Sequence, residues 1–296
     1  MTAIVMALAA AVLASGPVDA ATTAARQEGV PAASQAATRL KVVDHNIEKR
    51  SLALDRALKA AAVNDAAVIT LQEVCWWQAD QLVATHPEWT IAWKPERNRG
   101  KCRRSGIPGG TLVSPQERVG NVAIWTGGPG GVTTTHTFAT QRVASDRAGL
   151  ACVSWVDGAR QHACSAHLIV PFSNREAAVR TKQARDVRKI TGRWLAQDDL
   201  VIVGGDFNAI PKRKTMGYLY AYQGQGNFRE ATARALGARD CRCRQPTMDK
   251  RRQKIDYIFY STNRLGPRDF RGLRTVRTMS DHHLLIGWAD VDTSAR

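Results

Sequence analysis

The protein has 296 residues, of which 44% are hydrophobic, so it can bury the core of one large domain or two small ones, and this composition argues against disorder along the whole chain. Lysine and arginine number 42 against 26 aspartate and glutamate, which gives a formal net charge of +16. This charge favours an anionic partner, either nucleic acid or an acidic membrane surface, although a secreted protein can also be cationic without binding either.

The first twenty residues have the pattern of a secretory signal peptide. An apolar run over 4–13 is too short to cross a membrane as a helix, and a site of the signal-peptidase kind, Val18-Asp19-Ala20, follows it. No lysine or arginine precedes the run, so either this signal is atypical or the start codon lies elsewhere, and a disordered alanine-rich leader is the alternative. We expect residues 1–20 to be removed from a secreted protein and 21–38 to form a flexible linker.

Beyond the linker, apolar patterns predict strands that alternate with helices and hairpins. Strand-like runs occupy 40–47, 67–71, 122–125, 132–138, 150–156, 162–170, 200–203, 255–260, 270–276 and 284–288. Apolar residues at helical spacing predict helices over 51–62 and 174–196. The glycine-rich segment 127–131 lacks the Gly-Lys-Ser/Thr ending of a phosphate-binding loop, so we interpret it as a hairpin connection. Strands outnumber helices, and the predicted fold class is α/β with mixed sheets.

None of the remaining hydrophobic stretches is long enough to cross a bilayer, so we expect no stable membrane insertion, and we expect a monomer. Six cysteines, an even number, suit an oxidising compartment. Cys152 and Cys164 flank a turn signal between two strand-like runs, so they could face each other across a hairpin. The other candidate pairs are Cys75 with Cys102 and Cys241 with Cys243. A zinc site is not expected, because the last pair has no partner pair at finger-like spacing.

Polar side chains recur where the apolar runs end. In chain order they are Asn46, Glu73, His167, Asp206, Asn208, Asp256, Asp281 and His282. Sites on open sheets gather at such strand ends, and carboxylates are conspicuous in so basic a chain. Carboxylate oxygens without a thiolate suit Mg²⁺, Mn²⁺ or Ca²⁺, which can neutralise phosphate oxygens and orient a water. A histidine beside a carboxylate can act as an acid or a base near neutral pH.

Each of these residues also has a purely structural interpretation. Asp206 and Asn208 could be turn formers, because their side chains bond their own backbone well. Glu73 could be a first-turn charge that a helix dipole favours. His167 could be a hydrogen-bonded core histidine, and Asp281 could cap a helix. Their joint occurrence at successive strand ends favours the chemical interpretation.

This ordered set resembles the endonuclease/exonuclease/phosphatase superfamily, which has the deoxyribonuclease I-like fold. The matching pieces are Asn46-Ile47, Gln72-Glu73, Gly120-Asn121-Val122-Ala123, Ala166-His167-Leu168, Gly205-Asp206-Phe207-Asn208, Ile255-Asp256-Tyr257 and Ser280-Asp281-His282, with Arg180 and Gln183 on the helix after His167. Any one piece alone is weak, whereas their order is specific. The resemblance implies a four-layered α/β sandwich, with two mixed β-sheets packed face to face and flanking helices, and a catalytic domain over 39–292.

The resemblance also implies hydrolysis of a phosphoester by in-line attack of a metal-activated water. Glu73 would be the principal metal ligand, with Asn46 and Asp281 near the metal. The expected cofactor is Mg²⁺, or else Mn²⁺ or Ca²⁺.

Five further residues would carry the reaction in such a protein. Asp206 would position or deprotonate the attacking water, and Asn208 would hold the phosphate. His282, oriented by Asp256, would face the phosphate. His167 would contact the phosphate from a second position and protonate the leaving oxygen. This second histidine is typical of the deoxyribonuclease and sphingomyelinase branches of the family.

Two positions stay open in the comparison with the family. Arg118 lies where members place a phosphate-contacting side chain, but Glu117 is an equally arguable match, and Arg180 is the other candidate contact. Many relatives follow Ser-Asp-His with another residue and then proline, whereas His283-Leu284 stands here. The conformation of that loop is therefore in question, and His283 could compete with His282 for the site.

Basic segments favour a secreted nuclease that acts on DNA or RNA. They lie at 97–104, 212–214, 242–254 and 264–277, and the second and third flank strand-end carboxylates. Lysine and arginine would supply sequence-independent, salt-sensitive contacts to phosphates. The alternative is that these segments are solvated charge runs.

Two other functions stay open. A sphingomyelinase-like phospholipid phosphodiesterase, or another phosphatase of the superfamily, would share the same site residues. It would need exposed apolar residues for lipid, for which Trp76-Trp77 is a candidate unless the two side chains pack or begin a helix, and the basic charge would help at an anionic bilayer. A non-catalytic nucleic-acid-binding protein is the third possibility, but an intact acidic site argues against it.

Overall fold

The structure, a computed structural model, describes residues 37–97, 102, 118–143, 146–232, 245–266 and 271–295. All of these belong to one compact unit, Gln35–Arg296. The signal peptide and nearly all of the linker lie outside the described residues and stay predictions. The same holds for Glu117, for the pairing of Cys241 with Cys243, and for most of the basic segment 97–104.

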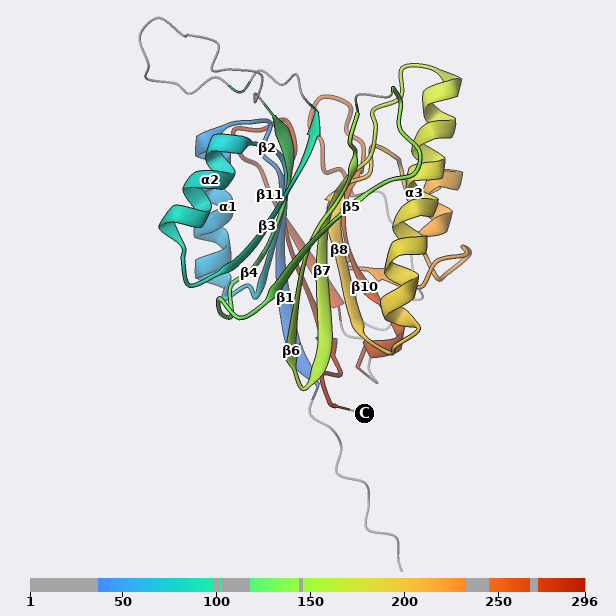
Figure 1. Cartoon of the computed structure of the whole chain (residues 1–296). Helices are drawn as coiled ribbons and strands as arrows, with labels where there is room; N and C mark the ends of the chain where they lie inside the picture. The colour runs from blue at the N-terminus through green and yellow to red at the C-terminus, as the bar shows by residue number, and fades with distance from the viewer. Residues whose placement is uncertain are drawn as a thin grey trace, which may run out of the picture. The chain divides into compact units, whose positions relative to one another are not determined.

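The described residues build two mixed sheets of six strands each (Figure 1). The first contains β1 (Thr38–Asn46), β2 (Val68–Cys75), β3 (Thr90–Arg97), β4 (Val119–Trp125), β11 (Arg271–Val276) and β12 (Leu284–Val291). The second contains β5 (Val132–Thr137), β6 (Gly149–Asp157), β7 (Ala159–His167), β8 (Leu200–Asp206), β9 (Phe228–Glu230) and β10 (Asp256–Ser261). Their strand orders are β11-β12-β1-β2-β4-β3 and β5-β6-β7-β8-β10-β9. In each sheet the described strands form one parallel pair, β1 with β2 and β7 with β8.

A crossover helix joins the strands of each parallel pair, as parallel neighbours require. Helix α1 (Ser51–Asn64) joins β1 to β2, and α3 (Asn174–Leu195) joins β7 to β8. The apolar side of α1 packs with the first sheet, together with α2 (Trp76–Thr85), and α3 packs with the second. Figure 1 shows α1 and α2 on one side of the paired sheets and α3 on the other. The four-layered α/β sandwich is therefore confirmed.

The main core lies between the two sheets. Leu40, Val42 and Val68 of the first sheet pack in one cluster with Ile202 and Ile258 of the second. Alternate residues of a strand point to opposite faces. The residues that follow four of these inward positions, Val43, Ile69, Val203 and Phe259, belong to the clusters that contain the helices. Because both faces are covered, central strands read as continuous apolar runs. Fully burying each such side chain contributes about 1.5–3 kcal/mol to folding.

The hairpin that joins β6 to β7 forms where the turn signal predicts it. Asp157 pairs with Ala159 across the turn. Cys152 and Cys164 stand directly opposite each other in this hairpin and form a disulfide. A second disulfide joins Cys75 to Cys102, and no cysteine among the described residues is free. Both pairings agree with the sequence expectation.

The predicted hairpin across the glycine-rich segment is wrong. Strand β4 pairs with β2 and β3, whereas β5 pairs with β6 in the other sheet. The segment instead crosses from one sheet to the other and runs close to β3, because the Gly131 N–H donates to Thr90 Oγ1 at 3.0 Å. A Cβ on Gly131 would lie 2.7 Å from that oxygen, so the glycine allows the close approach. Turn residues indicate a change of direction but not which sheet receives the next strand.

Strand β3 was not predicted, because charged residues hide its pattern. Lys94 and Glu96 are both buried there, at positions where a sequence pattern would require apolar side chains. The 3₁₀ helices η1 (Lys214–Tyr218) and η2 (Thr262–Arg264) and the short β9 also had no clear signal. Trp76 and Trp77 begin α2, as one interpretation proposed. Among the helices in the described ranges, none is both long and apolar enough to cross a membrane.

Candidate functional site

The polar strand ends converge because of the topology. Asn46 ends β1, while His167 and Asp206 end the parallel strands β7 and β8 and pair with each other. Strand β10 runs antiparallel to β8, so its first residue, Asp256, pairs with Asp206. Strand β12 runs antiparallel to β1 in the same way, and His282 lies just before its start. Five of the expected site residues therefore come to one edge of the two sheets.

Two glycines before Asp206 let β8 lie close to its neighbours. A Cβ on Gly204 would lie 2.1 Å from Thr70 Oγ1 of the facing sheet, and a Cβ on Gly205 would lie 2.0 Å from the Ala166 carbonyl oxygen. Neither approach leaves room for a side chain, since real Cβ atoms do not come within 3 Å of such atoms. The two glycines of Gly-Gly-Asp-Phe-Asn thus let the end of β8, which carries Asp206, lie close to β7 and to the facing sheet.

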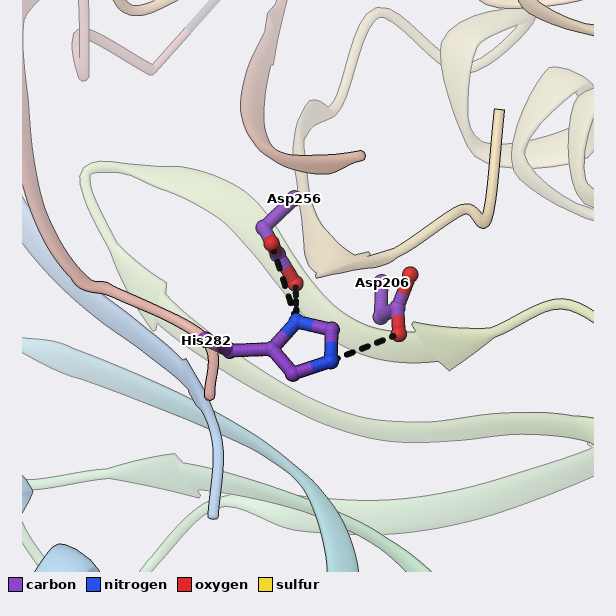
Figure 2. Close-up of side chains that lie close together, drawn as sticks. All are labelled: Asp206, Asp256 and His282. Carbon is purple, nitrogen blue, oxygen red and sulfur yellow. Dashed lines mark hydrogen bonds and ion pairs between the residues drawn. The ribbon is translucent and has the colours of Figure 1, made fainter. Parts of the chain in front are cut away.

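Asp206, His282 and Asp256 form a chain of carboxylate, imidazole and carboxylate (Figure 2). His282 Nδ1 bonds Asp256 Oδ1 at 2.9 Å, and His282 Nε2 lies 3.7 Å from Asp206 Oδ2. Thr247 Oγ1 donates to Asp256 Oδ2 at 2.6 Å and so fixes that carboxylate. Burial alone would lower the pKa of His282, but the negative charges of Asp256 and Asp206 raise it to about 10. Burial, and then the charge of Asp256, raises the pKa of Asp206 to about 6.

A second imidazole approaches the same carboxylate from the other side. His167 Nδ1 bonds Glu96 Oε2 at 3.1 Å, and His167 Nε2 lies 3.7 Å from Asp206 Oδ2. Asn121 Nδ2 donates to Glu96 Oε1 at 2.8 Å. Burial alone would lower the pKa of His167, but the charges of Glu96 and Asp206 raise it to about 9. Asp206 is therefore flanked by two imidazoles, each held by its own carboxylate.

Glu96 is the site residue that sequence reasoning missed. It lies on β3 and is buried, but β3 is far from β7 in the sequence, and no short motif joins Glu96 to His167. The one available signal is Asn121, which belongs to the matched motif Gly120-Asn121-Val122-Ala123 and holds Glu96. Asn121 has no role of its own in the matched motif, and a search for its hydrogen-bond partner would have led to Glu96.

Glu73 reaches the site through a bulge in β2. The register with β4 shifts between Leu71 and Val74, and Glu73 takes a left-handed backbone conformation with φ 54°. Such a conformation costs a non-glycine residue on the order of 1 kcal/mol and is common at functional sites. Its carboxylate is ion-paired with Lys49. Burial alone would raise the pKa of Glu73, but the positive charges of His167 and Lys49 lower it to about 2.

The oxygen donors around Glu73 fit a hard divalent cation. Glu73 and Asp281 line the same cavity, and each carboxylate is paired with a lysine ammonium, Lys49 for Glu73 and Lys250, at 3.0 Å, for Asp281. Both positions therefore attract a cation, and oxygen ligands without sulfur suit Mg²⁺, Mn²⁺ or Ca²⁺. Asn46, the third expected residue near the metal, makes a contact with Asp206 instead: its Nδ2 donates to Asp206 Oδ2 at 3.1 Å.

Another group of residues has the spacing of a metal site, but two of its members are already hydrogen-bonded to each other, and one of these to Thr247. Ligand atoms of Asp206, Asp256 and His282 lie within 4.8 Å of one another. However, the oxygens of Asp256 already accept hydrogen bonds from Thr247 Oγ1 and His282 Nδ1. In this arrangement the Asp256 carboxylate orients the imidazole of His282, whose Nε2 faces Asp206. We therefore interpret these three residues as a proton-handling chain.

The cavity over these groups has a volume of about 520 Å³. Asn208 and Arg180 also line it. Asn208 takes a left-handed conformation with φ 49°, which asparagine tolerates, and its backbone N–H donates to Asp206 Oδ1 at 2.8 Å. Arg180, on α3, is buried and donates to the Asn208 carbonyl oxygen.

Two residues whose part in the site stayed open in the sequence analysis, Arg118 and His283, lie away from the cavity. The Arg118 side chain is exposed and is not among the described residues that line the cavity. His283 bonds Asp249 through Nε2 at 2.9 Å, so it does not compete with His282 for Asp256. The geometry thus places His282 in the site, whereas Arg118 has no contact there.

Comparisons with known proteins establish the family match and the fold. A model described as the Endonuclease/Exonuclease/phosphatase family matches residues 44–282. No curated protein sequence matches this chain significantly. Similar solved structures include the human Nocturnin catalytic domain with bound sulfate anion, at 16% identity and a TM-score of 0.61, covering 86% of this chain and 94% of that one. D. rerio TDP2 complexed with single strand DNA product has 16% identity and a TM-score of 0.59, covering 85% and 99%. SmcL has 18% identity and a TM-score of 0.55, also covering 85% and 99%. At such identities these likenesses establish the fold.

Proposed function

This chain belongs to the endonuclease/exonuclease/phosphatase family, and we propose that it is a secreted, divalent-metal-dependent nuclease that hydrolyses phosphodiester bonds of DNA or RNA. The observation that carries the proposal is the placement of Asp206 between two carboxylate-held imidazoles, at 3.7 Å from each. Such an arrangement offers one proton acceptor and two proton donors around a single reacting centre. Two disulfides among the described residues are compatible with secretion.

Asp206 would accept the proton of the attacking water. Its Oδ1 is fixed by the Asn208 N–H, and its Oδ2 faces Asn46 Nδ2 and the two imidazoles. A pKa raised to about 6 makes this carboxylate a stronger base than an exposed aspartate while leaving it ionised at neutral pH. A divalent cation at Glu73 and Asp281 would supply charge neutralisation on the phosphate and a more acidic water.

His282 and His167 would stabilise and protonate the phosphoryl oxygens. Both carry a positive charge at neutral pH because their carboxylate partners raise their pKa. Fixed positive charge in a water-poor site stabilises developing negative charge on the phosphorus oxygens. His167 would give its proton to the leaving oxygen, and Asn208 would hold the phosphate beside it.

The charges and packing around the cavity support nucleic acid as the substrate. Arg180, Arg213 and Arg251 line the cavity and would contact neighbouring phosphates. D. rerio TDP2, which shares the fold, is described with a single strand DNA product. Trp77, one of the two residues suggested for lipid contact, packs against the Cys75–Cys102 disulfide and Val119, which favours a structural role for it. Arg118 keeps only the weaker role of an exposed charge outside the cavity.

A substrate panel tests this proposal. The protein without residues 1–20 should cleave single-stranded DNA, plasmid DNA or RNA with Mg²⁺ or Mn²⁺, and cleavage should stop with a chelator. Rising salt should weaken binding, because phosphate contacts release counterions. Sphingomyelin and a phosphoinositide serve as the competing substrates. Faster hydrolysis of either lipid would overturn the assignment of nucleic acid while leaving the family unchanged.

A further inference from the structure

An exposed aromatic ring lines the proposed catalytic cavity. The Phe172 side chain is 79% exposed, yet it lines the same cavity as Asp206 and His282. Single exposed apolar residues are common on protein surfaces, so exposure alone carries no function. The position of this ring beside the reacting groups is what makes it informative.

The backbone holds Phe172 in a fixed place. Its N–H donates to Glu176 Oε2 at 2.7 Å, and Ser173 Oγ accepts from the Glu176 N–H at 3.2 Å to cap α3. Residue 172 therefore directly precedes a capped helix of 22 residues. The backbone that carries the ring is therefore fixed before a ligand arrives, which lowers the entropy cost of binding.

An apolar wall continues from the ring into the cavity. Val170 and Pro171 line it on the same loop as Phe172, and Ile210 and Met248 line it from other segments. This wall lies in the same cavity as the acidic residues Glu73 and Asp281. One cavity thus combines acidic side chains that attract a cation with a set of apolar side chains.

Arginines without acidic partners accompany the apolar wall. Arg180 is 8% exposed, and its Nε is buried without a hydrogen-bond partner. Arg213 and Arg251 are exposed and line the same cavity. In the described part of the chain, none of these three arginines pairs with a carboxylate. Asp206 offsets part of the charge of the buried Arg180, but the nearby Arg213 adds positive charge, so this part of the cavity favours an anion.

We propose that Phe172 and its apolar wall stack one unpaired nucleobase next to the scissile bond, while Arg180, Arg213 and Arg251 hold an adjoining phosphate. This inference rests on the proposed nuclease function and specifies its substrate as single-stranded or locally unpaired nucleic acid. A nucleic acid strand carries flat bases and anionic phosphates in alternation, which matches an aromatic ring beside arginines. Aromatic side chains stack with any base. In a duplex the faces of the bases are covered by their neighbours, so a base must first leave the stack.

Three substitutions at Phe172 test the stacking. On a single-stranded oligonucleotide with a mapped cleavage position, Phe172→Ala should lower kcat/KM about tenfold. Phe172→Trp should keep the wild-type rate, whereas Phe172→Leu should behave as the alanine variant does, because leucine is apolar but has no ring. Val156→Ala, on an exposed residue of β6 outside the cavity, is the matched control. Recovery by leucine would overturn stacking in favour of simple apolar contact.

A double-mutant cycle, in which the enzyme loses the Phe172 ring and the substrate loses a base, isolates the contact between the two. One base on either side of the mapped bond is removed, which leaves an abasic sugar. At one of the two positions, this removal should slow the wild type about tenfold and the Phe172→Ala variant by less than about twofold. The wild type should also prefer the single strand to the duplex, and the alanine variant should lose that preference. Equal effects of base removal on both enzymes would overturn the stacking.

A second substitution tests the phosphate contact. Replacing one adjoining phosphodiester with an uncharged methylphosphonate should slow the wild type, but it should have a much smaller effect on Arg213→Gln. Equal slowing of both enzymes would overturn that contact. If the wild type cleaves no nucleic acid, the proposed function fails together with this inference. If it cleaves nucleic acid but shows no coupling, only the inference fails. Tighter binding of wild type than of Phe172→Ala to sphingomyelin vesicles, without coupling on DNA, would assign the ring to membrane contact instead.

Discussion

Replacing His282 with alanine is expected to lower kcat for hydrolysis of DNA by about 10³-fold, since a positioned acid or base contributes about 10²–10⁴ in rate. His282 is 6% exposed and lies between Asp256, at 2.9 Å, and Asp206, at 3.7 Å. The variant removes both a proton donor and the positive charge that faces the phosphate. Steady-state kinetics on single-stranded DNA with saturating Mg²⁺ measure the loss.

Two further variants separate this loss from a folding defect. Alanine leaves the buried Asp256 carboxylate without its imidazole, so His282→Gln is measured as well, because an amide N–H can still bond Asp256 but cannot transfer a proton. His283→Ala is the matched control, since the neighbouring histidine bonds Asp249 outside the cavity. The glutamine variant should be nearly as slow as the alanine variant, and His283→Ala should keep the wild-type rate. Comparable losses at both histidines would contradict the assigned role of His282.

Removing the proposed metal, or the carboxylate of Glu73 proposed to bind it, is expected to lower activity to a similar extent. A chelator should abolish DNA cleavage, and Mg²⁺ or Mn²⁺ should restore it. Glu73→Gln should weaken Mn²⁺ binding by at least about 100-fold and lower activity at limiting metal accordingly. The physical reason is that this substitution removes the charge of a carboxylate whose pKa is lowered to about 2 by surrounding positive groups.

Calorimetric titration of Mn²⁺ measures this binding without any activity assay. Glu88→Gln serves as the control, because Glu88 is an exposed carboxylate that does not line the cavity. Glu88→Gln should bind Mn²⁺ as the wild type does, and high Mn²⁺ should partly restore cleavage by Glu73→Gln. Undiminished activity in chelator, or unchanged Mn²⁺ binding by Glu73→Gln, would contradict a metal site at Glu73.

Much of the fold could be predicted because its central strands are buried on both faces. The runs that became β2 and β8 consist largely of apolar residues, β1 could be identified from Leu40, Val42 and Val43, and the turn before Ala159 predicted its hairpin. The strand-end residues Asn46, Asp206 and Asp256 could be identified from position alone, because each ends or begins such a run. That these residues come together depends on which strands pair with one another, and strand pairing could not be predicted from the sequence.

What could not be predicted depends on contacts between distant segments. Glu96 is a charged residue near the end of β3, and its bonds to His167 in the other sheet and to Asn121 explain why it is buried. The crossing of 126–131 between sheets depends on which edge receives β5. The backbone conformation of Glu73, with φ 54° in a bulge, cannot be read from a strand-like run. These features arise from tertiary packing and not from local pattern.

The most direct test compares wild type with Asp206→Asn, both purified in parallel, on single-stranded DNA with Mg²⁺. The amide keeps the size of the carboxylate, but it cannot accept the proton of the attacking water, and parallel purification reveals any contaminating nuclease. Release of short oligonucleotides should be about 10³-fold faster with the wild type. Equal release by both proteins would contradict hydrolysis at this site.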